Sequence, residues 1–367
     1  MTEEKEQVST SSTEYCISFD DVKKAAQRIQ GIAHKTPVLT SRSIIASSQH
    51  DDGKHYFFKV EAMQKTGSFK FRGALNAVKN QLEINTSDDH DKKELLVVTH
   101  SSGNHAQALA LASKLASNET KTVAATIVMP KAAPLVKKNA VKDFGATIVM
   151  VESTNEARRS EAEKIIAATG ATFIHPSENP QVIAGQGTVC LEFVEQVRGM
   201  LGGTGNLDAV IIPVGGGGLA SGNCISLRSM LGDKVKIILA EPETLDDTKR
   251  SFQEGRLLKH EPDNKLDSVA DGLKTTLGPN TWPVVRDFVD DVITVSEEAI
   301  LRATKLVWER LKVVIEPSAG VGVAVALGLE FNAKHKKSDG IRNVGIVLCG
   351  GNVDVLKIAS KMNELGI

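Results

Sequence analysis

The chain has 367 residues, of which 41% are hydrophobic and 24% charged, with a formal net charge of −1. This length favours two lobes or one large α/β unit, and the balanced charge gives no indication of a nucleic-acid or membrane-surface partner. The four cysteines are scattered without a CxxC pair. A disulfide framework or zinc site is therefore not expected, and a reducing, cytoplasmic setting is favoured.

The chain begins with a polar, acidic stretch, residues 1–14, which predicts a disordered tail. Short apolar runs rich in β-branched residues predict buried strands at 94–99, 124–129, 147–151, 172–175, 209–214, 235–240 and 344–348. Helical patterns lie between them at 106–115, at 153–169 (with an N-cap box at 153–156 and Gly170 as the stop) and at 297–312. Strands that alternate with helices predict parallel sheets wrapped by helices.

A lysine lies in an apolar setting in the segment 66–73. Lys70 stands between Phe69 and Phe71, beside small residues. Burial would lower the pKa of this lysine, and a neutral amine is what an aldehyde needs to form an imine. A surface lysine in a turn is the alternative that this segment alone leaves open.

Four consecutive glycines follow the predicted strand 209–214 and precede a helical stretch. A backbone without side chains can approach a phosphate closely and point several N–H groups at it, and the following helix adds its positive end. The run is neither GxGxxG nor a Walker loop. A candidate imine lysine and a phosphate-binding loop together indicate a phosphorylated aldehyde cofactor, pyridoxal 5′-phosphate.

Two further loops follow predicted strands. In the loop 100–105, Ser101, Ser102 and Asn104 are candidates to hold a carboxylate or a phenolate oxygen. After the last predicted strand, Cys349 is either a weak S–H donor to a ring nitrogen or a buried thiol beside a glycine turn.

From residue 15 to residue 364, the chain resembles the fold-type II pyridoxal phosphate enzymes, the group of threonine and serine dehydratases and serine racemases, and most of all the eukaryotic serine racemases. The motifs that carry the resemblance are 15–19, 65–70, 99–105, 182–188, 213–218, 316–322 and 350–354. The resemblance implies a tryptophan-synthase-β-like α/β fold whose two lobes each hold a mostly parallel, twisted sheet. It implies a large cofactor-binding domain, 15–94 plus 179–367, and a small domain, 95–178, that closes over the substrate.

The resemblance also implies an activity: reversible racemisation of L- and D-serine, with β-elimination of serine to pyruvate and ammonia. Lys70 would act as the base on one face of the Cα and Ser102 on the other, because racemisation needs a proton donor or acceptor on each side. A threonine/serine dehydratase and an aspartate racemase stay open as alternatives, since Ser177 replaces an asparagine in a substrate loop. A non-catalytic sensor on the same fold is the rival from another class.

The remaining site residues are also implied by the resemblance. The cofactor contacts would be Phe69 against the ring, Asn104 at the 3′ oxygen, Cys349 at the pyridine nitrogen, and Gly215, Gly216, Gly217, Gly218 and Leu219 at the phosphate. Substrate contacts would come from Ser101, Ser102, Arg158 and Thr275. Glu241, Asp247 and the carbonyl of Leu245 would bind Mg²⁺, Ca²⁺ or Mn²⁺, although without the resemblance this segment is an acidic turn. An ATP effector site would involve Lys65, Gln107 and Asn352, and the chain would form a homodimer.

Overall fold

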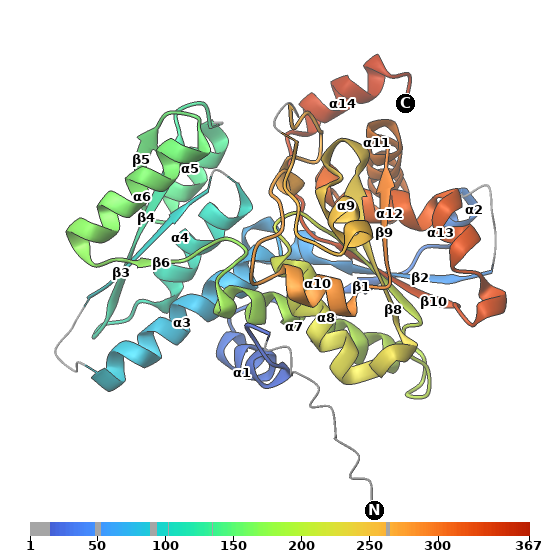
Figure 1. Ribbon diagram of the computed structural model, residues 1–367, viewed down its shortest axis with the longest axis horizontal. Coiled ribbons are helices and arrows are strands. Elements are labelled where there is room, and N and C mark those ends of the chain that lie inside the picture. Colours follow the sequence, from blue (N-terminus) through green and yellow to red (C-terminus); the bar gives the residue numbers. More distant parts are fainter. Residues whose placement is uncertain (1–14, 48–52, 89–93, 102, 134, 262–264) are drawn as a thin grey trace, which may run out of the picture.

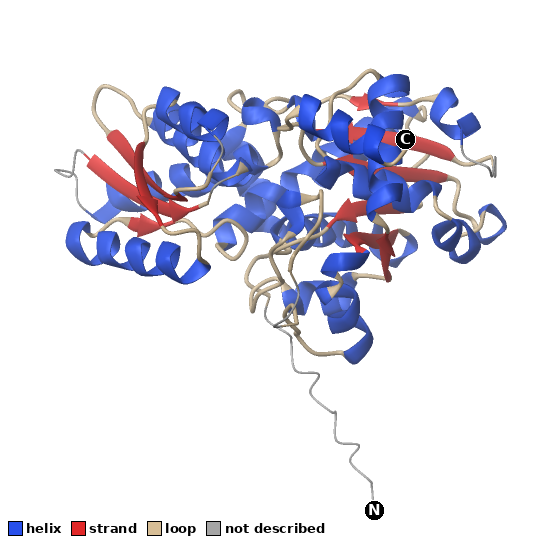
Figure 2. Ribbon diagram, turned by 90° about the horizontal axis from the view of Figure 1, so that it is seen from above, coloured by secondary structure: helices blue, strands red, loops and turns tan. Residues whose placement is uncertain are grey.

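Two separate sheets organise the computed structural model, which describes residues 15–47, 53–88, 94–101, 103–133, 135–261 and 265–367. Within these residues, the larger sheet has the strand order β1-β2-β10-β7-β8-β9 and the smaller one β5-β4-β3-β6. All neighbours pair in parallel except β1 and β2. Figures 1 and 2 show the two sheets in separate halves of the molecule, each flanked by helices. The predicted fold class is confirmed, whereas the predicted tail, 1–14, lies outside the described residues.

The strands are short and mostly buried. The larger sheet contains β1 (Val38–Leu39), β2 (His55–Val60), β7 (Ala209–Pro213), β8 (Lys236–Pro242), β9 (Asp291–Val295) and β10 (Asn343–Leu348). The smaller sheet contains β3 (Glu94–His100), β4 (Thr122–Pro130), β5 (Thr147–Val151) and β6 (Thr172–Phe173). Every predicted strand is present, β5 with the predicted ends and the others with one or both ends shifted, while β1, β2 and β9 were not predicted.

The helices follow the strands and cover both sheets. They are α1 (Phe19–Ile29), α2 (Arg42–Ser47), α3 (Lys70–Asp88), α4 (Asn104–Ala116), α5 (Leu135–Asp143), α6 (Asn155–Thr169), α7 (Pro180–Met200), α8 (Gly218–Leu231), α9 (Asp247–Glu254), α10 (Trp282–Phe288), α11 (Glu297–Leu306), α12 (Pro317–Leu327), α13 (Leu329–Lys334) and α14 (Val355–Glu364). Among the described residues, no helix combines the length and apolar character needed to cross a membrane.

The predicted helices are present, but several of their ends differ from the structure, as in α4, where both ends extend beyond the predicted 106–115. The N-cap of α6 is Thr154, whose Oγ1 accepts the N–H of Ala157 at 3.1 Å, so the predicted cap one residue earlier was wrong. The predicted stop at Gly170 is confirmed, because this residue takes a left-handed φ of 68°. The predicted helix 297–312 ends at Leu306 and continues as a π-helical turn, Val307–Leu311.

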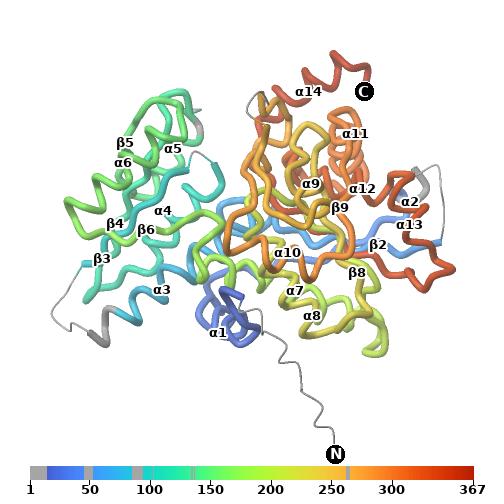
Figure 3. The backbone as a smooth tube through the Cα atoms, in the orientation of Figure 1, coloured from blue at the N-terminus to red at the C-terminus, as the bar shows by residue number. Residues whose placement is uncertain are grey.

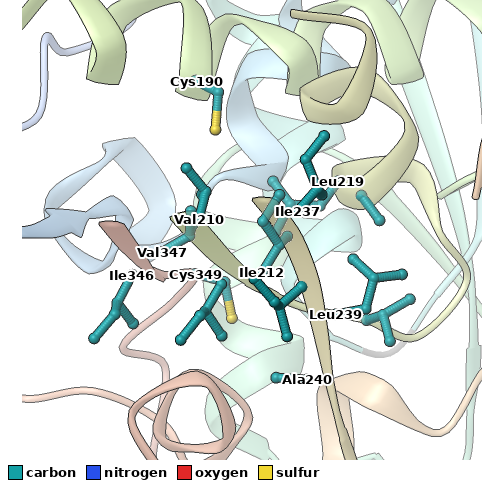
Figure 4. Packing of buried hydrophobic residues seen from close by; sticks show 14 of the residues in the cluster. Cys190, Val210, Ile212, Leu219, Ile237, Leu239, Ala240, Ile346, Val347 and Cys349 are labelled. Carbon is teal, nitrogen blue, oxygen red and sulfur yellow. The ribbon is translucent and has the colours of Figure 1, made fainter. Parts of the chain in front are cut away.

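The core of the larger sheet is apolar on both faces. All five residues of β7 are buried, and the small side chains of α12 let this helix approach closely: a Cβ on Gly322 would lie 3.5 Å from both Ile346 and Pro213. Figure 4 shows side chains of β7, β8 and β10 packed together, with Cys349 in the same cluster. Coverage on both faces explains why these strands are continuous apolar runs in the sequence.

A buried ionic cluster fixes the start of α3 to the larger sheet. Arg72 forms ion pairs with Glu61 at 2.8 Å and Glu192 at 3.0 Å, and Glu192 also pairs with Lys59 of β2 at 2.5 Å. All four charges are therefore compensated. Removing one partner of such a buried pair typically costs about 3–5 kcal/mol.

The chain enters the smaller half through α3 and returns to the larger half through α7, as Figure 3 shows. Phe71 and Leu75 of α3 pack in the core of the smaller sheet, although the predicted boundaries assign α3 to the larger domain. Glu94, assigned to the larger domain as well, is the first residue of β3. The domain division itself stays a prediction.

Candidate active site

The start of α3 lies against the loop that follows β10. Ser68 and Gly350 form an antiparallel bridge, the N–H of Phe69 donates to the carbonyl of Cys349 at 3.1 Å, and the N–H of Gly351 donates to the carbonyl of Gly67 at 2.9 Å. These contacts place Lys70, the first residue of α3, at the carboxyl end of the larger sheet. Ligands bind at this edge in open α/β sheets.

The amine of Lys70 is held in place and poorly hydrated. Its Nζ donates to the carbonyl of Pro176 at 2.8 Å and lies 5.0 Å from the centre of the Phe69 ring. Loss of water around the amine lowers the pKa of Lys70 to about 8, although Cys349 and Glu316 act in the opposite direction. A substantial fraction of the amine is therefore neutral near physiological pH, as the sequence prediction requires.

The glycine loop follows β7 and leads into the first residue of α8, Gly218. Gly217 has a left-handed φ of 79°, and a Cβ there would lie 2.5 Å from Leu277 and 2.7 Å from Thr281. A Cβ on Gly216 would lie 2.5 Å from the Oγ of Ser177. Side chains are thus excluded, and the first-turn N–H groups of α8 are available to an anion. This cradle fits a phosphate group, and Leu219 packs in the core behind it.

Asn104 belongs to a partly buried polar network with Glu316, whose charge acts on Lys70. Its Nδ2 donates to the carboxyl group of Glu316 at 2.9 and 3.2 Å, and its Oδ1 accepts from Asn352 at 2.9 Å. Burial raises the pKa of Glu316 to about 7, while the hydrogen bond from Asn104 acts to lower it. Glu316 was not predicted as a site residue, although it begins the motif 316–322.

Cys349 directly follows β10 and is buried. Burial raises the pKa of its thiol well above the ordinary value, so the group stays a neutral S–H. A neutral partner is compatible with the predicted position opposite a pyridine nitrogen. The contact itself stays a prediction.

The predicted substrate residues come from two loops and α6. Ser101 Oγ accepts the N–H of Gly103 at 3.3 Å, and Ser102 lies outside the described residues. Thr275 borders the glycine loop, since a Cβ on Gly216 would lie 3.2 Å from its Oγ1. Arg158 of α6 donates to Asn155 and Thr154. Its role at the substrate stays a prediction.

The predicted metal ligands surround the start of α9. Glu241 accepts the N–H groups of Thr248 and Lys249, each at 3.0 Å. Burial, with the nearby charge of Asp247, raises the pKa of Glu241 to about 8, and burial raises the pKa of Asp247 to about 7. Asp247 Oδ2 is buried without a hydrogen-bond partner. The described residues contain no group of three or more His, Cys, Asp or Glu side chains that would hold a metal, but two carboxylates and the Leu245 carbonyl suit a hard cation.

The predicted nucleotide residues lie near the polar network that links Asn104, Glu316 and Asn352. Lys65 is in the 3-10 turn Lys65–Gly67, which contacts α4, where Gln107 is buried. Asn352 donates to the carbonyl of Thr66 at 2.7 Å as well as to Asn104. The structure brings these segments together, and nucleotide binding by them stays a prediction.

A lysine amine with a lowered pKa and a glycine loop that excludes side chains, both in contact with the turn of Pro176 and Ser177, are features that a pyridoxal phosphate enzyme needs. The chain belongs to the family described as pyridoxal-phosphate dependent enzymes, whose model matches residues 29–350. Within this family, it is 46% identical to the serine racemase of Rattus norvegicus over 348 residues, which cover 94% of this chain and 96% of that protein.

Solved structures agree with this relationship. The serine racemase of Dictyostelium discoideum is 45% identical, with 93% of this chain and 100% of that one covered and a TM-score of 0.80. A pyridoxal 5′-phosphate-dependent aspartate racemase is 37% identical, with 94% and 98% covered and a TM-score of 0.83.

Proposed function

We propose that this chain interconverts L- and D-serine and also converts serine to pyruvate and ammonia by β-elimination followed by hydrolysis. The main support is the Lys70 amine. It donates to the Pro176 carbonyl at 2.8 Å, and its lowered pKa keeps it partly neutral. The next residue, Ser177, borders the glycine cradle. The 46% identity to a serine racemase supports serine as the substrate.

Each site residue has a proposed task. Pyridoxal phosphate held in this site would withdraw electrons from an amino acid attached to it in place of Lys70, and would so make the Cα–H acidic. Lys70 Nζ then removes that proton on one face, and Ser102 supplies or removes a proton on the other. The residues that would hold the cofactor are Phe69, Asn104, Gly215, Gly216, Gly217, Gly218, Leu219 and Cys349. Glu316 orients Asn104 through the two hydrogen bonds at 2.9 and 3.2 Å.

Product analysis tests the proposal against its alternatives. Pure protein with the cofactor is incubated separately with L-serine, L-threonine and L-aspartate, and the D-enantiomers and keto acids are measured. D-serine with some pyruvate supports the proposal. Keto acids without D-serine would identify a dehydratase, and D-aspartate as the main product would identify an aspartate racemase, the activity named for the 37% identical structure.

Replacing Ser102 with alanine should affect the two enantiomers of serine differently. The enantiomer whose Cα–H faces Lys70 should still exchange its proton with D₂O, whereas exchange of the other enantiomer should fall by about 10²–10⁴-fold. Mass spectrometry of each enantiomer measures both rates. An equal effect on the two would contradict the role of Ser102 as the second acid–base group.

Excess Mg²⁺ or Ca²⁺ should stabilise the folded chain through Glu241, Asp247 and the carbonyl of Leu245. A cation at 100 times its dissociation constant adds about 2.7 kcal/mol to the free energy of unfolding, and a thermal melt measures the shift. Glu241→Gln should remove the shift. Glu243 is an exposed acid in the same turn, and Glu243→Gln should leave the thermal shift intact. A thermal shift of wild-type size in Glu241→Gln would exclude this site.

The pH at which the apoprotein captures pyridoxal phosphate should reflect the pKa of Lys70. Because only the neutral amine reacts, the capture rate should rise with pH, reach half its maximum near pH 8, and then level off, instead of rising through the ordinary value of 10.5. Stopped-flow absorbance measures the rate, with a free lysine derivative as the control. A half-maximum above pH 10 would show that the pKa of Lys70 is not lowered.

The proposal includes an ATP effector site at Lys65, Gln107 and Asn352, a homodimer, and a cytoplasmic location. Met63, Val314 and Leu356 are 46%, 52% and 83% exposed, on segments that converge at Gly351. A Cβ on this glycine would lie 2.7 Å from the carbonyl of Val314 and 3.1 Å from Ala62. Exposed apolar groups of this kind support a subunit contact. Sedimentation with and without ATP measures the oligomeric state of the chain and whether ATP changes it.

A further inference from the structure

His175 caps the turn that connects the smaller sheet to α7. Its Nδ1 accepts the backbone N–H of Ser177 at 3.2 Å and that of Glu178 at 2.9 Å. A ring nitrogen that accepts carries no proton, so the single proton of the neutral ring is on Nε2. The arrangement matches that of an asparagine or aspartate whose side chain binds backbone N–H groups two and three residues later.

The capped turn, residues 175–178, contacts both halves of the candidate site. The Pro176 carbonyl accepts the amine of Lys70 at 2.8 Å. The Ser177 Oγ lies 2.5 Å from where a Cβ on Gly216 would be. One short turn therefore sets the direction of the amine and closes one side of the glycine cradle.

Glu178 fixes the far end of the same turn. Its carboxylate accepts the N–H of Asn280 at 2.8 Å and the hydroxyl of Thr281 at 3.0 Å. Thr281 Oγ1 also lies 3.2 Å from the carbonyl of Gly216. The turn is thus tied at one end to the loop that supports the glycine cradle, and at the other end it depends on His175.

The surroundings of His175 keep its ring neutral and in place. The ring packs edge-on against His100 and Phe173, with centroids 6.0 and 5.9 Å away. Burial lowers the pKa of His175 to about 4, and the nearby charges of His100 and Lys70 act in the same direction. The accepting lone pair on Nδ1 is therefore available at neutral pH.

We propose that His175 is a positioning residue, whose Nδ1 holds the turn 175–178 so that the Pro176 carbonyl receives the Lys70 amine and Ser177 borders the glycine cradle. This inference rests on the proposed function, because it assigns His175 a task only if Lys70 carries the cofactor. Without the acceptor, two partly buried N–H groups lose their partner, and the turn reorganises to satisfy them.

Three substitutions separate the hydrogen-bond acceptor from the ring. His175→Asn keeps an acceptor that can reach the same N–H groups but removes the ring. His175→Phe keeps a ring of similar shape without an acceptor, and His175→Ala removes both. His55→Ala, an exposed histidine at the start of β2, is the matched control.

Each variant is measured as holoenzyme for the visible absorption band of bound pyridoxal phosphate, kcat for serine racemisation, and melting temperature. We expect His175→Asn to stay within about threefold of the wild-type kcat, with its band unchanged. His175→Phe and His175→Ala should lose roughly tenfold to a hundredfold in kcat, with a shifted or weakened band.

The proposal would be overturned if kcat depended on the ring instead of the acceptor, with His175→Phe near wild type and His175→Asn impaired. It would also be overturned if all three variants kept the wild-type kcat and absorption band. If His175→Ala fails to fold, the comparison of His175→Asn with His175→Phe decides the question. A wild-type protein without a visible band would instead refute the proposed function, so the two failures are distinguishable.

Discussion

Lys70→Ala should remove the visible absorption band of bound pyridoxal phosphate and lower serine racemisation by about 10³-fold or more. The variant loses both the attachment point of the cofactor and the base on one face of the Cα, and a positioned acid–base group alone contributes about 10²–10⁴-fold. Absorbance during cofactor titration and D-serine formation measure the two effects.

Two control variants of the Lys70 experiment sharpen its interpretation. Lys79→Ala removes a lysine from the same helix and should keep both the band and the activity. Lys70→Arg keeps a cation, but the guanidinium stays protonated and cannot bind an aldehyde, so this variant should resemble Lys70→Ala. A band of wild-type strength in Lys70→Ala would place the cofactor elsewhere.

The stability of Lys70→Ala should differ from that of wild type in a pH-dependent way. Because burial lowers the pKa of Lys70 to about 8 from 10.5, the unfolded chain binds more protons than the folded one between these values. The lysine therefore favours unfolding increasingly as pH falls toward 8. The alanine variant should thus melt at the same or a higher temperature than apo wild type at neutral pH.

Gly217→Ala should strongly weaken phosphate binding and destabilise the fold. The left-handed φ of 79° alone costs a non-glycine residue about 1–2 kcal/mol. The new Cβ would also lie 2.5 Å from Leu277 and 2.7 Å from Thr281. We expect the dissociation constant for pyridoxal phosphate to rise by at least about tenfold, as measured by titration, with a lower urea midpoint.

Gly203→Ala is the matched control for this substitution. Gly203 has a similar φ of 86°, but nothing lies within 4 Å of where its Cβ would be. This variant should show the backbone strain alone, with cofactor affinity unchanged. Equal cofactor affinity in Gly217→Ala and wild type would mean that the glycine loop does not bind the phosphate.

The sequence was sufficient to predict the buried parallel strands, because burial on both faces makes them continuous apolar runs. It was not sufficient for β2, whose run is interrupted by Lys59. This charge is tolerated inside the sheet because Glu192, 133 residues later in the chain, lies 2.5 Å away. A compensating contact between distant segments leaves no local pattern to recognise.

The candidate site shows the same contrast. Lys70 and the glycine loop could be proposed from the sequence, because an apolar lysine segment and a run of four glycines are local features with a direct chemical meaning. Glu316 and His175 were not recognised as site residues, because their importance comes from contacts. Glu316 binds Asn104, 212 residues away in the chain, and His175 acts through the backbone of its own turn.

The first half of α3 contacts both sheets. Arg72, near its start, is anchored by buried charges of the larger sheet, whereas Leu75 and Val78 pack in the core of the smaller one. A change in the spacing of the two sheets would therefore bend or pivot this helix about its first turn. Lys70 and the glycine loop, which both adjoin the larger sheet, would keep their relative positions, while the strand ends of the smaller sheet would move relative to them.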